Sequence, residues 1–206
     1  MTKRIMLPLF LVALAAPVAA QVPPPPAAPT ASAPKDDLVR VALETEAGRI
    51  VLALDRGRAS VTAANFLRYV ESGKLDGESF YRAMPYGEGG LIQGGILTNA
   101  LKLLPPIAHE STAKTGLKHV AGSVAMASLG PGKARSDFFI LTTDIPAFDA
   151  NGSDAGFAVF GRVVEGMDVV KKILASPVSP TRGEGSMKGQ MLEPAVAITK
   201  AARIDP

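Results

Sequence analysis

The sequence predicts a mainly β domain in the form of a closed or nearly closed barrel, and three observations support this prediction. Short apolar segments, bounded by Gly and polar residues, recur along the chain from position 37 onward. Only two segments have apolar residues at helical spacing. A chain of 206 residues, 47% of them hydrophobic, is long enough for one globular domain of ordinary size. Many short strands with few helices favour a barrel.

The first twenty residues are typical of a secretory signal peptide. Lys3 and Arg4 give a positive start, the range 5–16 an apolar middle, and the range 18–20 small residues before a cleavage site. A transmembrane anchor is the alternative, but Pro8 interrupts the apolar run, which is shorter than the roughly 20 residues that span a bilayer. We therefore expect a periplasmic or secreted protein that has no stable membrane insertion after cleavage.

The range 21–36 is rich in Pro and Ala. Such a tract cannot form a ladder of backbone hydrogen bonds, so it is expected to be an extended, solvated linker. A proline ligand for an aromatic groove is the alternative. The remaining range, 37–206, is expected to form the folded domain.

Composition excludes several classes of function. The formal net charge is +3, but without Lys3 and Arg4 the 22 basic residues fall to 20, against 19 acidic residues. A nucleic-acid partner is therefore not expected, because it requires a concentrated basic face. The chain has no cysteine, which excludes disulfides and thiolate chemistry.

The predicted elements start with a hairpin whose turn contains Gly48. Ser60 is expected to be the N-cap of a helix that continues through Glu71, and a second helix is expected over 167–175. The range 176–189 is expected to be a long connection, to which no function is assigned. The predicted strands cover 38–45, 48–54, 78–84, 90–97, 120–128, 137–143, 157–164 and 195–203.

Three groups of motifs occur in a fixed order. FYRAMP at 80–85 leads into LIQGG at 91–95, SVAMAS at 123–128 leads into SDFFI at 136–140, and FAVFGRVVEGM occupies 157–167. Together they resemble the cyclophilin-type peptidyl-prolyl cis-trans isomerases. The resemblance implies an eight-stranded antiparallel barrel closed by two α-helices. It also implies an enzyme that needs no cofactor or metal and acts on proline-containing segments of unfolded or folding proteins.

By this resemblance Arg82 is the catalytic residue. Twisting an X-Pro amide removes its resonance, so the prolyl nitrogen becomes a better acceptor for a fixed guanidinium. Gln93 is expected to hold the substrate backbone or to orient Arg82. A surface Arg paired with Glu78 or Glu88, and a purely structural Gln, remain as alternatives.

The resemblance also implies an apolar substrate pocket with a groove beside it. For each apolar member, ordinary core packing is the alternative interpretation. Along the groove, a strand edge can pair with an extended peptide. The expected residues are Phe139 at the floor, Leu91 and Met126 beside it, Phe148 at the rim, and Ala127 and Ser128 along the groove.

Two departures from the family pattern affect the site directly. Gly90 replaces an aromatic residue that precedes Leu91, and Tyr86 is a candidate to take over that wall. Asp137 replaces a substrate-binding Gln and is a candidate ion-pair partner for Arg82. Both changes are expected to weaken or reshape substrate binding.

Three further departures concern the substrate site: Ser128 replaces an Asn, Ala147 a bulky ring, and Phe157 a His or Tyr. The altered positions Gly90, Asp137, Ala147 and Phe157 motivate a second hypothesis, a non-catalytic binding module or chaperone for proline-containing segments. The first hypothesis, an isomerase that assists the folding of exported proteins, is favoured because Arg82 and Gln93 are present. The protein is expected to be a monomer. The two histidines have no metal-ligand spacing, so no metal site is expected.

Overall fold

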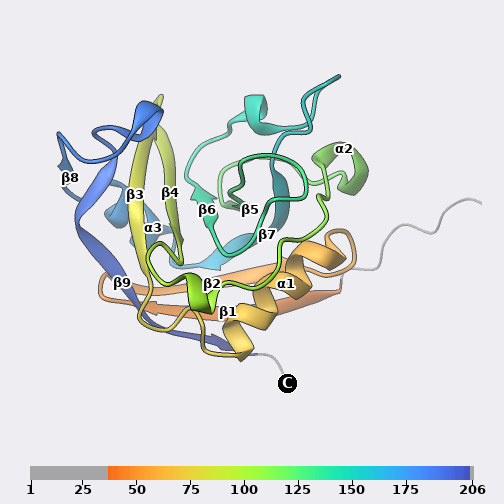
Figure 1. Ribbon diagram of the computed structural model, residues 1–206, viewed down its shortest axis with the longest axis horizontal. Coiled ribbons are helices and arrows are strands. Elements are labelled where there is room, and N and C mark those ends of the chain that lie inside the picture. Colours follow the sequence, from red (N-terminus) through yellow and green to blue (C-terminus); the bar gives the residue numbers. More distant parts are fainter. Residues whose placement is uncertain (1–36, 205–206) are drawn as a thin grey trace, which may run out of the picture. The chain divides into compact units, whose positions relative to one another are not determined.

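Strand β9 (Met191–Arg203) pairs with both β1 (Leu38–Thr45) and β3 (Ser79–Tyr86), and this double pairing closes the sheet into a barrel (Figure 1). The computed structural model describes residues 37–204, so the predicted signal peptide and linker lie outside the described residues. The other strands are β2 (Gly48–Asp55), β4 (Gly89–Gly95), β5 (Ser123–Met126), β6 (Phe138–Leu141), β7 (Ala158–Glu165) and β8 (Val178–Ser179).

The order of strands around the barrel is β1-β2-β7-β5-β6-β4-β3-β9, and each neighbouring pair is antiparallel. The predicted eight-stranded antiparallel barrel is therefore confirmed. The two-residue strand β8 pairs with β9 outside this ring. It lies in the range 176–189, for which the sequence predicted only a connection.

The two predicted α-helices are present, and the described part of the chain adds a short third one. Helix α1 (Ser60–Glu71) contacts β9, β7 and β2, and helix α3 (Met167–Leu174) contacts β2, β3 and β4. Among the described residues, no helix has the length and apolar character needed to cross a membrane. The α-helices are α1 (Ser60–Glu71), the one-turn α2 (Thr112–Thr115) and α3 (Met167–Leu174), with 3-10 turns at Ala100–Lys102, Pro146–Phe148 and Gly185–Met187.

The start of α1 differs from the expectation. Ala59 is the N-cap and makes no side-chain capping bond, whereas Ser60 is already helical. The Glu110 carboxylate takes over the capping role: it accepts from the backbone N–H groups of Val61 and Thr62 at 3.1 and 2.8 Å, and from the Thr62 hydroxyl at 2.7 Å. A carboxylate at this position satisfies N–H groups that have no partner within the helix.

Side chains alternate between two apolar clusters, as the period of two in a strand requires. One cluster, the barrel core, contains Val124, Phe138 and Ile140 together with apolar residues of α1 and α3. The other, here called the outer cluster, contains Ala125 and Phe139. Its remaining members are Leu91, Leu141, Ile145 and Val159, with Met84, Leu117, Ala127, Phe148 and Phe157 packed against it.

Candidate active site

One row of paired residues crosses the barrel wall and carries the predicted catalytic groups. Arg82 on β3 is opposite Gln93 on β4, which is opposite Phe139 on β6, which is opposite Ala125 on β5. Directly paired residues in an antiparallel sheet have their side chains on the same face. The row therefore places a guanidinium, an amide and an aromatic ring next to one another, beside the outer cluster.

Amide oxygens hold the Arg82 guanidinium. Its Nε and Nη2 donate to the Gln190 oxygen at 2.9 and 2.7 Å, and its Nη1 donates to the Gln93 oxygen at 2.9 Å. Nη2 also contacts the sulfur of Met84 at 3.4 Å. Burial lowers the pKa of Arg82 from its usual value, but an arginine remains protonated at neutral pH. Neutral groups thus fix the orientation of the positively charged guanidinium.

Gln93 is 9% exposed and connects Arg82 to the Tyr81 hydroxyl. Its Nε2 donates to the Tyr81 hydroxyl at 2.7 Å, and the charge of Asp137 also acts on Tyr81. Burial, and then the charge of Asp137, raise the pKa of Tyr81 above its ordinary value. The expected ion pair between Asp137 and Arg82 is not among the ion pairs of the described residues.

Aromatic rings form the apolar part of the site. The Phe139 ring centroid is 5.8 Å from that of Phe148 and 5.4 Å from that of Phe157, both nearly perpendicular to it. The His119 ring stacks on Phe139 at 6.0 Å, with an interplanar angle of 17°. Edge-to-face rings at these separations are favourable arrangements. The structure thus brings together Phe139, the expected floor, Phe148, the expected rim, and Phe157.

His119 contributes a neutral ring to this group. Its side chain is fully buried, and its Nδ1 lies 2.8 Å from a carboxylate oxygen of Asp149. Burial lowers the pKa of His119, and the Asp149 carboxylate only partly opposes that effect. The imidazole is therefore uncharged at neutral pH, and its stacking on Phe139 is that of an apolar ring.

The comparisons with known proteins agree with this geometry. The family model described as cyclophilin type peptidyl-prolyl cis-trans isomerase/CLD matches residues 40–202. The chain belongs to this family. The peptidyl-prolyl cis-trans isomerase A of Dickeya dadantii is 41% identical over 137 residues, which cover 65% of this chain and 70% of that protein. A peptidyl-prolyl cis-trans isomerase of Acinetobacter baylyi is 38% identical over 143 residues, covering 68% of this chain and 73% of that protein.

A cyclophilin-type isomerase of Cryptosporidium parvum has the same fold. Its crystal structure matches with a TM-score of 0.66 at 21% identity, over 82% of this chain and 99% of that one. A second crystal structure of that protein, in the presence of the dipeptide Ala-Pro, matches with a TM-score of 0.64 at 20% identity, over 81% of this chain and 99% of that one. The predicted family, enzyme class and barrel fold are therefore confirmed.

Met126 does not take the place that was expected for it in this cyclophilin. It is 1% exposed and belongs to the barrel core, whereas its neighbours Ala125 and Ala127 belong to the outer cluster. Alternation along β5 explains the difference, because residues 125 and 127 share one face and residue 126 lies on the other. The role beside Phe139 falls instead to Met84, which is paired with Leu91 and packs against the outer cluster.

The Gly90 position cannot hold the aromatic residue found in other cyclophilins. A Cβ atom there would lie 2.1 Å from the Met84 carbonyl oxygen, and the φ angle of Gly90 is +151°. Tyr86, the proposed replacement, is 49% exposed at the hairpin between β3 and β4 and is absent from the outer cluster.

Of the two expected groove residues, Ser128 borders a separate cavity of about 340 Å³, whereas Ala127 does not line it. Ser128, Ala147 and Phe157 line it, and the small Ala147 side chain helps to leave it open. The Ser128 hydroxyl donates to the Gly130 carbonyl at 3.2 Å, and this local bond stabilises the loop that contains both residues. This cavity adjoins the aromatic group through Phe148 and Phe157.

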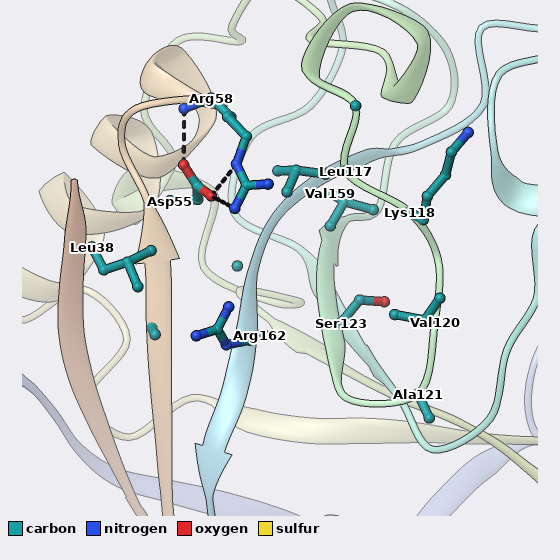
Figure 2. Close-up of a pocket in the computed structure, with 13 residues that line it drawn as sticks. Leu38, Asp55, Arg58, Leu117, Lys118, Val120, Ala121, Ser123, Val159 and Arg162 are labelled. Carbon is teal, nitrogen blue, oxygen red and sulfur yellow. Dashed lines mark hydrogen bonds and ion pairs between the residues drawn. The ribbon is translucent and has the colours of Figure 1, made fainter. Parts of the chain in front are cut away.

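Another cavity, of about 290 Å³, lies between β1, β2, β7 and the segment before β5 (Figure 2). Figure 2 shows the Asp55 carboxylate held by Arg58, with Arg162 and apolar side chains around the same space. None of Arg82, Gln93 and Asp137 lines it. The cavity is thus distinct from the candidate active site.

Four residues of the site were not singled out from the sequence as parts of it: Tyr81, Met84, His119 and Gln190. Tyr81 and Met84 lie within two residues of Arg82 in FYRAMP, but the motif alone did not indicate which side chains they contact. Gln190 is 108 residues from Arg82 and follows the connection whose function was not assigned. The only sequence feature that could have pointed to His119 was its position shortly before SVAMAS.

Proposed function

We propose that this protein accelerates the cis-trans isomerisation of X-Pro peptide bonds during the folding of exported proteins, with Arg82 as the catalytic group. The observation that carries the proposal is the setting of the guanidinium. It is positively charged, held by two amide oxygens, and placed beside an apolar aromatic pocket. The names of the relatives, all peptidyl-prolyl cis-trans isomerases, support the same activity.

The mechanism follows from differential binding. A planar X-Pro amide has a barrier of about 18–20 kcal/mol to rotation because resonance delocalises the nitrogen lone pair. At the twisted transition state the lone pair is localised, so a hydrogen bond from Arg82 to the prolyl nitrogen is strongest there. Phe139 would hold the pyrrolidine ring while the preceding residue rotates. No covalent bond forms or breaks, and no proton is transferred.

The guanidinium retains a donor for this purpose. It has five N–H donors, and the four contacts described above use Nε, both Nη2 hydrogens and one Nη1 hydrogen. Among the described residues, the second Nη1 hydrogen has no recorded acceptor. A substrate nitrogen or carbonyl at that position would therefore not displace Gln93 or Gln190.

The decisive experiment is exchange NMR on Ala-Xaa-Pro peptides with wild type and Arg82→Ala. Loss of one preorganised donor typically lowers turnover by roughly 10²–10³, and we expect a reduction of that size. Arg162→Ala is the matched control, because Arg162 is also a strand arginine but lines the other cavity. Peptide-induced chemical shifts without faster exchange in the wild type would instead identify a binding module without catalysis.

The exported setting rests on the sequence of the first twenty residues, with its positive start, apolar middle and small residues at 18–20. We expect N-terminal sequencing of the protein from the periplasmic fraction of an expressing bacterium to begin at Gln21. A protein that keeps Met1 and remains in the cytoplasmic fraction would contradict this part of the proposal.

A further inference from the structure

The cavity of about 340 Å³ beside Ser128 shares two aromatic rings with the candidate active site. Phe148 and Phe157 line the cavity, and their ring centroids are also 5.8 and 5.4 Å from that of Phe139. Neighbouring residues of an extended peptide are about 3.3 Å apart along the chain. A residue one or two positions from a proline on Phe139 therefore lies at the distance of this cavity.

The cavity is on the side of Phe139 that is opposite to Arg82. The order of strands in this part of the barrel is β3-β4-β6-β5-β7, with Arg82 on β3 and Phe139 on β6. Of the residues that line the cavity, Ser128 follows β5 and Phe157 precedes β7. A peptide bound between Arg82 and Phe139 thus continues toward the cavity at one of its ends.

The charge of the cavity is negative. Among the described residues that line it, Asp154 is the only charged one. Asp154 is exposed, and an exposed aspartate is ionised at neutral pH. The cavity therefore combines aromatic walls with one anionic group at its edge.

Hydrogen bonds hold the Asp154 carboxylate in place. Its Oδ1 accepts from the Gly156 N–H at 2.9 Å, and the backbone N–H groups of Asn151 and Asp154 donate to each other's carbonyl oxygen at 2.9 and 2.8 Å. Gly156 has a φ angle of +60°, and a Cβ atom there would lie 2.4 Å from the Phe148 carbonyl oxygen, so this loop packs closely on the cavity wall. Oδ2 makes no hydrogen bond within residues 37–204 and is available to a ligand.

We propose that this cavity is a subsite for a lysine or arginine side chain that lies next to the proline of the substrate, and that Asp154 selects this side chain. Its methylene groups pack on Phe148 and Phe157, and its charged end reaches Oδ2 of Asp154. The proposal rests on the proposed function, because it names a substrate class for the same site.

The chemistry of the cavity favours a basic side chain over other occupants. Lysine and arginine have a long apolar stem that packs on apolar surface while the charge remains near water. Aromatic rings such as Phe148 and Phe157 also attract a cation that lies over their faces. An acidic side chain would instead meet the like charge of Asp154, so the cavity discriminates by repulsion as well as by attraction. Ala147, which replaces a bulky ring, leaves room for the stem.

The test is exchange NMR on Ala-Ala-Pro-Ala-Ala peptides in which one alanine at a time is replaced by Lys or by Glu. We expect kcat/KM of the wild type to be about 3- to 10-fold higher with Lys than with Glu at one flanking position, a size typical of an exposed ion pair. The difference should lie mainly in KM, because the contact is the same in the ground state and the transition state. It should decrease with added salt.

Variants then assign the preference to Asp154. Asp154→Asn should bring the ratio of kcat/KM for Lys and Glu peptides close to 1, and Asp154→Lys should invert it. Ala147→Phe should lower the same ratio because the ring occupies the cavity. Asp168→Asn, at an exposed position in the first turn of α3, is the matched control and should keep the wild-type ratio. A ratio does not depend on how much of each variant is folded.

A second measurement locates the contact. The backbone amide signals of Asp154 and Gly156 should shift when the Lys peptide is added and much less with the Glu peptide. A wild-type ratio near 1 at all flanking positions, or a preference for Lys that persists in Asp154→Lys, would overturn the proposal. Full activity of Arg82→Ala would instead refute the proposed function on which it rests.

Discussion

The Gln190 side-chain oxygen accepts two hydrogen bonds from Arg82, at 2.9 Å from Nε and 2.7 Å from Nη2. These residues are 108 positions apart in the chain. Gln190 precedes β9, and the Gln190 carbonyl also accepts from the Ala83 N–H at 2.9 Å. Backbone pairing between β3 and the start of β9 therefore fixes Gln190, and Gln190 fixes the plane of the guanidinium.

Replacing Gln190 should impair catalysis more than binding. In Gln190→Ala the guanidinium loses two of its hydrogen bonds and can rotate about its side chain, while the aromatic pocket stays intact. Misplacing a catalytic group by about 1 Å can cost roughly 10²-fold in rate, so we expect kcat to fall about 10- to 100-fold with KM little changed. Exchange NMR at a series of peptide concentrations measures kcat and KM. Lys188→Ala in the same segment is the control. An unchanged kcat would show that Gln93 alone is sufficient.

Truncating Phe139 should reduce both stability and activity. The ring is buried and contacts His119, Phe148 and Phe157. Phe→Ala in a core typically lowers the free energy of unfolding by about 3–5 kcal/mol. We expect a loss of that order in urea unfolding, together with a large fall in kcat/KM. Phe139→Leu keeps the fold for the kinetic measurement if the alanine variant is unstable.

Tyr86→Ala is the counterpart to that experiment. Because Tyr86 is half exposed and absent from the outer cluster, its removal should change kcat/KM and unfolding very little. A severalfold rise in KM would show that Tyr86 closes over bound peptide after all.

Glu110 should be important for stability and not for catalysis. It caps α1 through three hydrogen bonds to Val61 and Thr62, and it is 5% exposed. Glu110→Ala leaves the Thr62 N–H and hydroxyl without this partner, which should lower the free energy of unfolding by about 1–3 kcal/mol. Thermal unfolding beside Glu165→Ala, an exposed Glu→Ala control, measures the effect. Equal transition temperatures would contradict the capping role.

The Asp137 carboxyl should make the protein more stable in mild acid. Its pKa in the folded state, about 6, is above the ordinary value of 3.8, so the folded state binds more protons than the unfolded state between these values. As pH falls from about 7 to about 4, the unfolding free energy of the wild type should rise relative to that of Asp137→Asn. Urea unfolding at several pH values tests this. A stability difference between the two proteins that does not change over this pH range would contradict the raised pKa of Asp137.

Local sequence patterns were sufficient for most of the fold. Alternating apolar residues and glycine turns predicted the barrel strands, and helical spacing predicted α1 and α3. The cap of α1 was wrong because Ser60 satisfies the local rule, whereas Glu110 acts from 50 positions further along the chain. The strand β8 was missed because two residues carry no periodicity.

The site was predicted where the motifs are local and missed where they are not. Arg82, Gln93 and Phe139 were predicted from their motifs, and the register then placed them in one row. Met126 was assigned to the pocket because its apolar character did not reveal on which side of β5 it lies. Asp137 was expected to pair with Arg82, but no sequence pattern could show that the amides of Gln93 and Gln190 hold Arg82. Gln190 depended entirely on long-range pairing.

The double pairing of β9 also determines when the site becomes complete. The hairpin of β3 and β4 is local and brings Arg82 to Gln93 by itself. Gln190 joins only when the start of β9 pairs with β3, and the rest of β9 pairs with β1 to close the ring. A folding intermediate with the hairpin but an open barrel would hold its guanidinium by a single amide. The onset of catalysis during refolding would therefore report the pairing of β9 with β3, so the isomerase activity itself would measure this step of the protein's own folding.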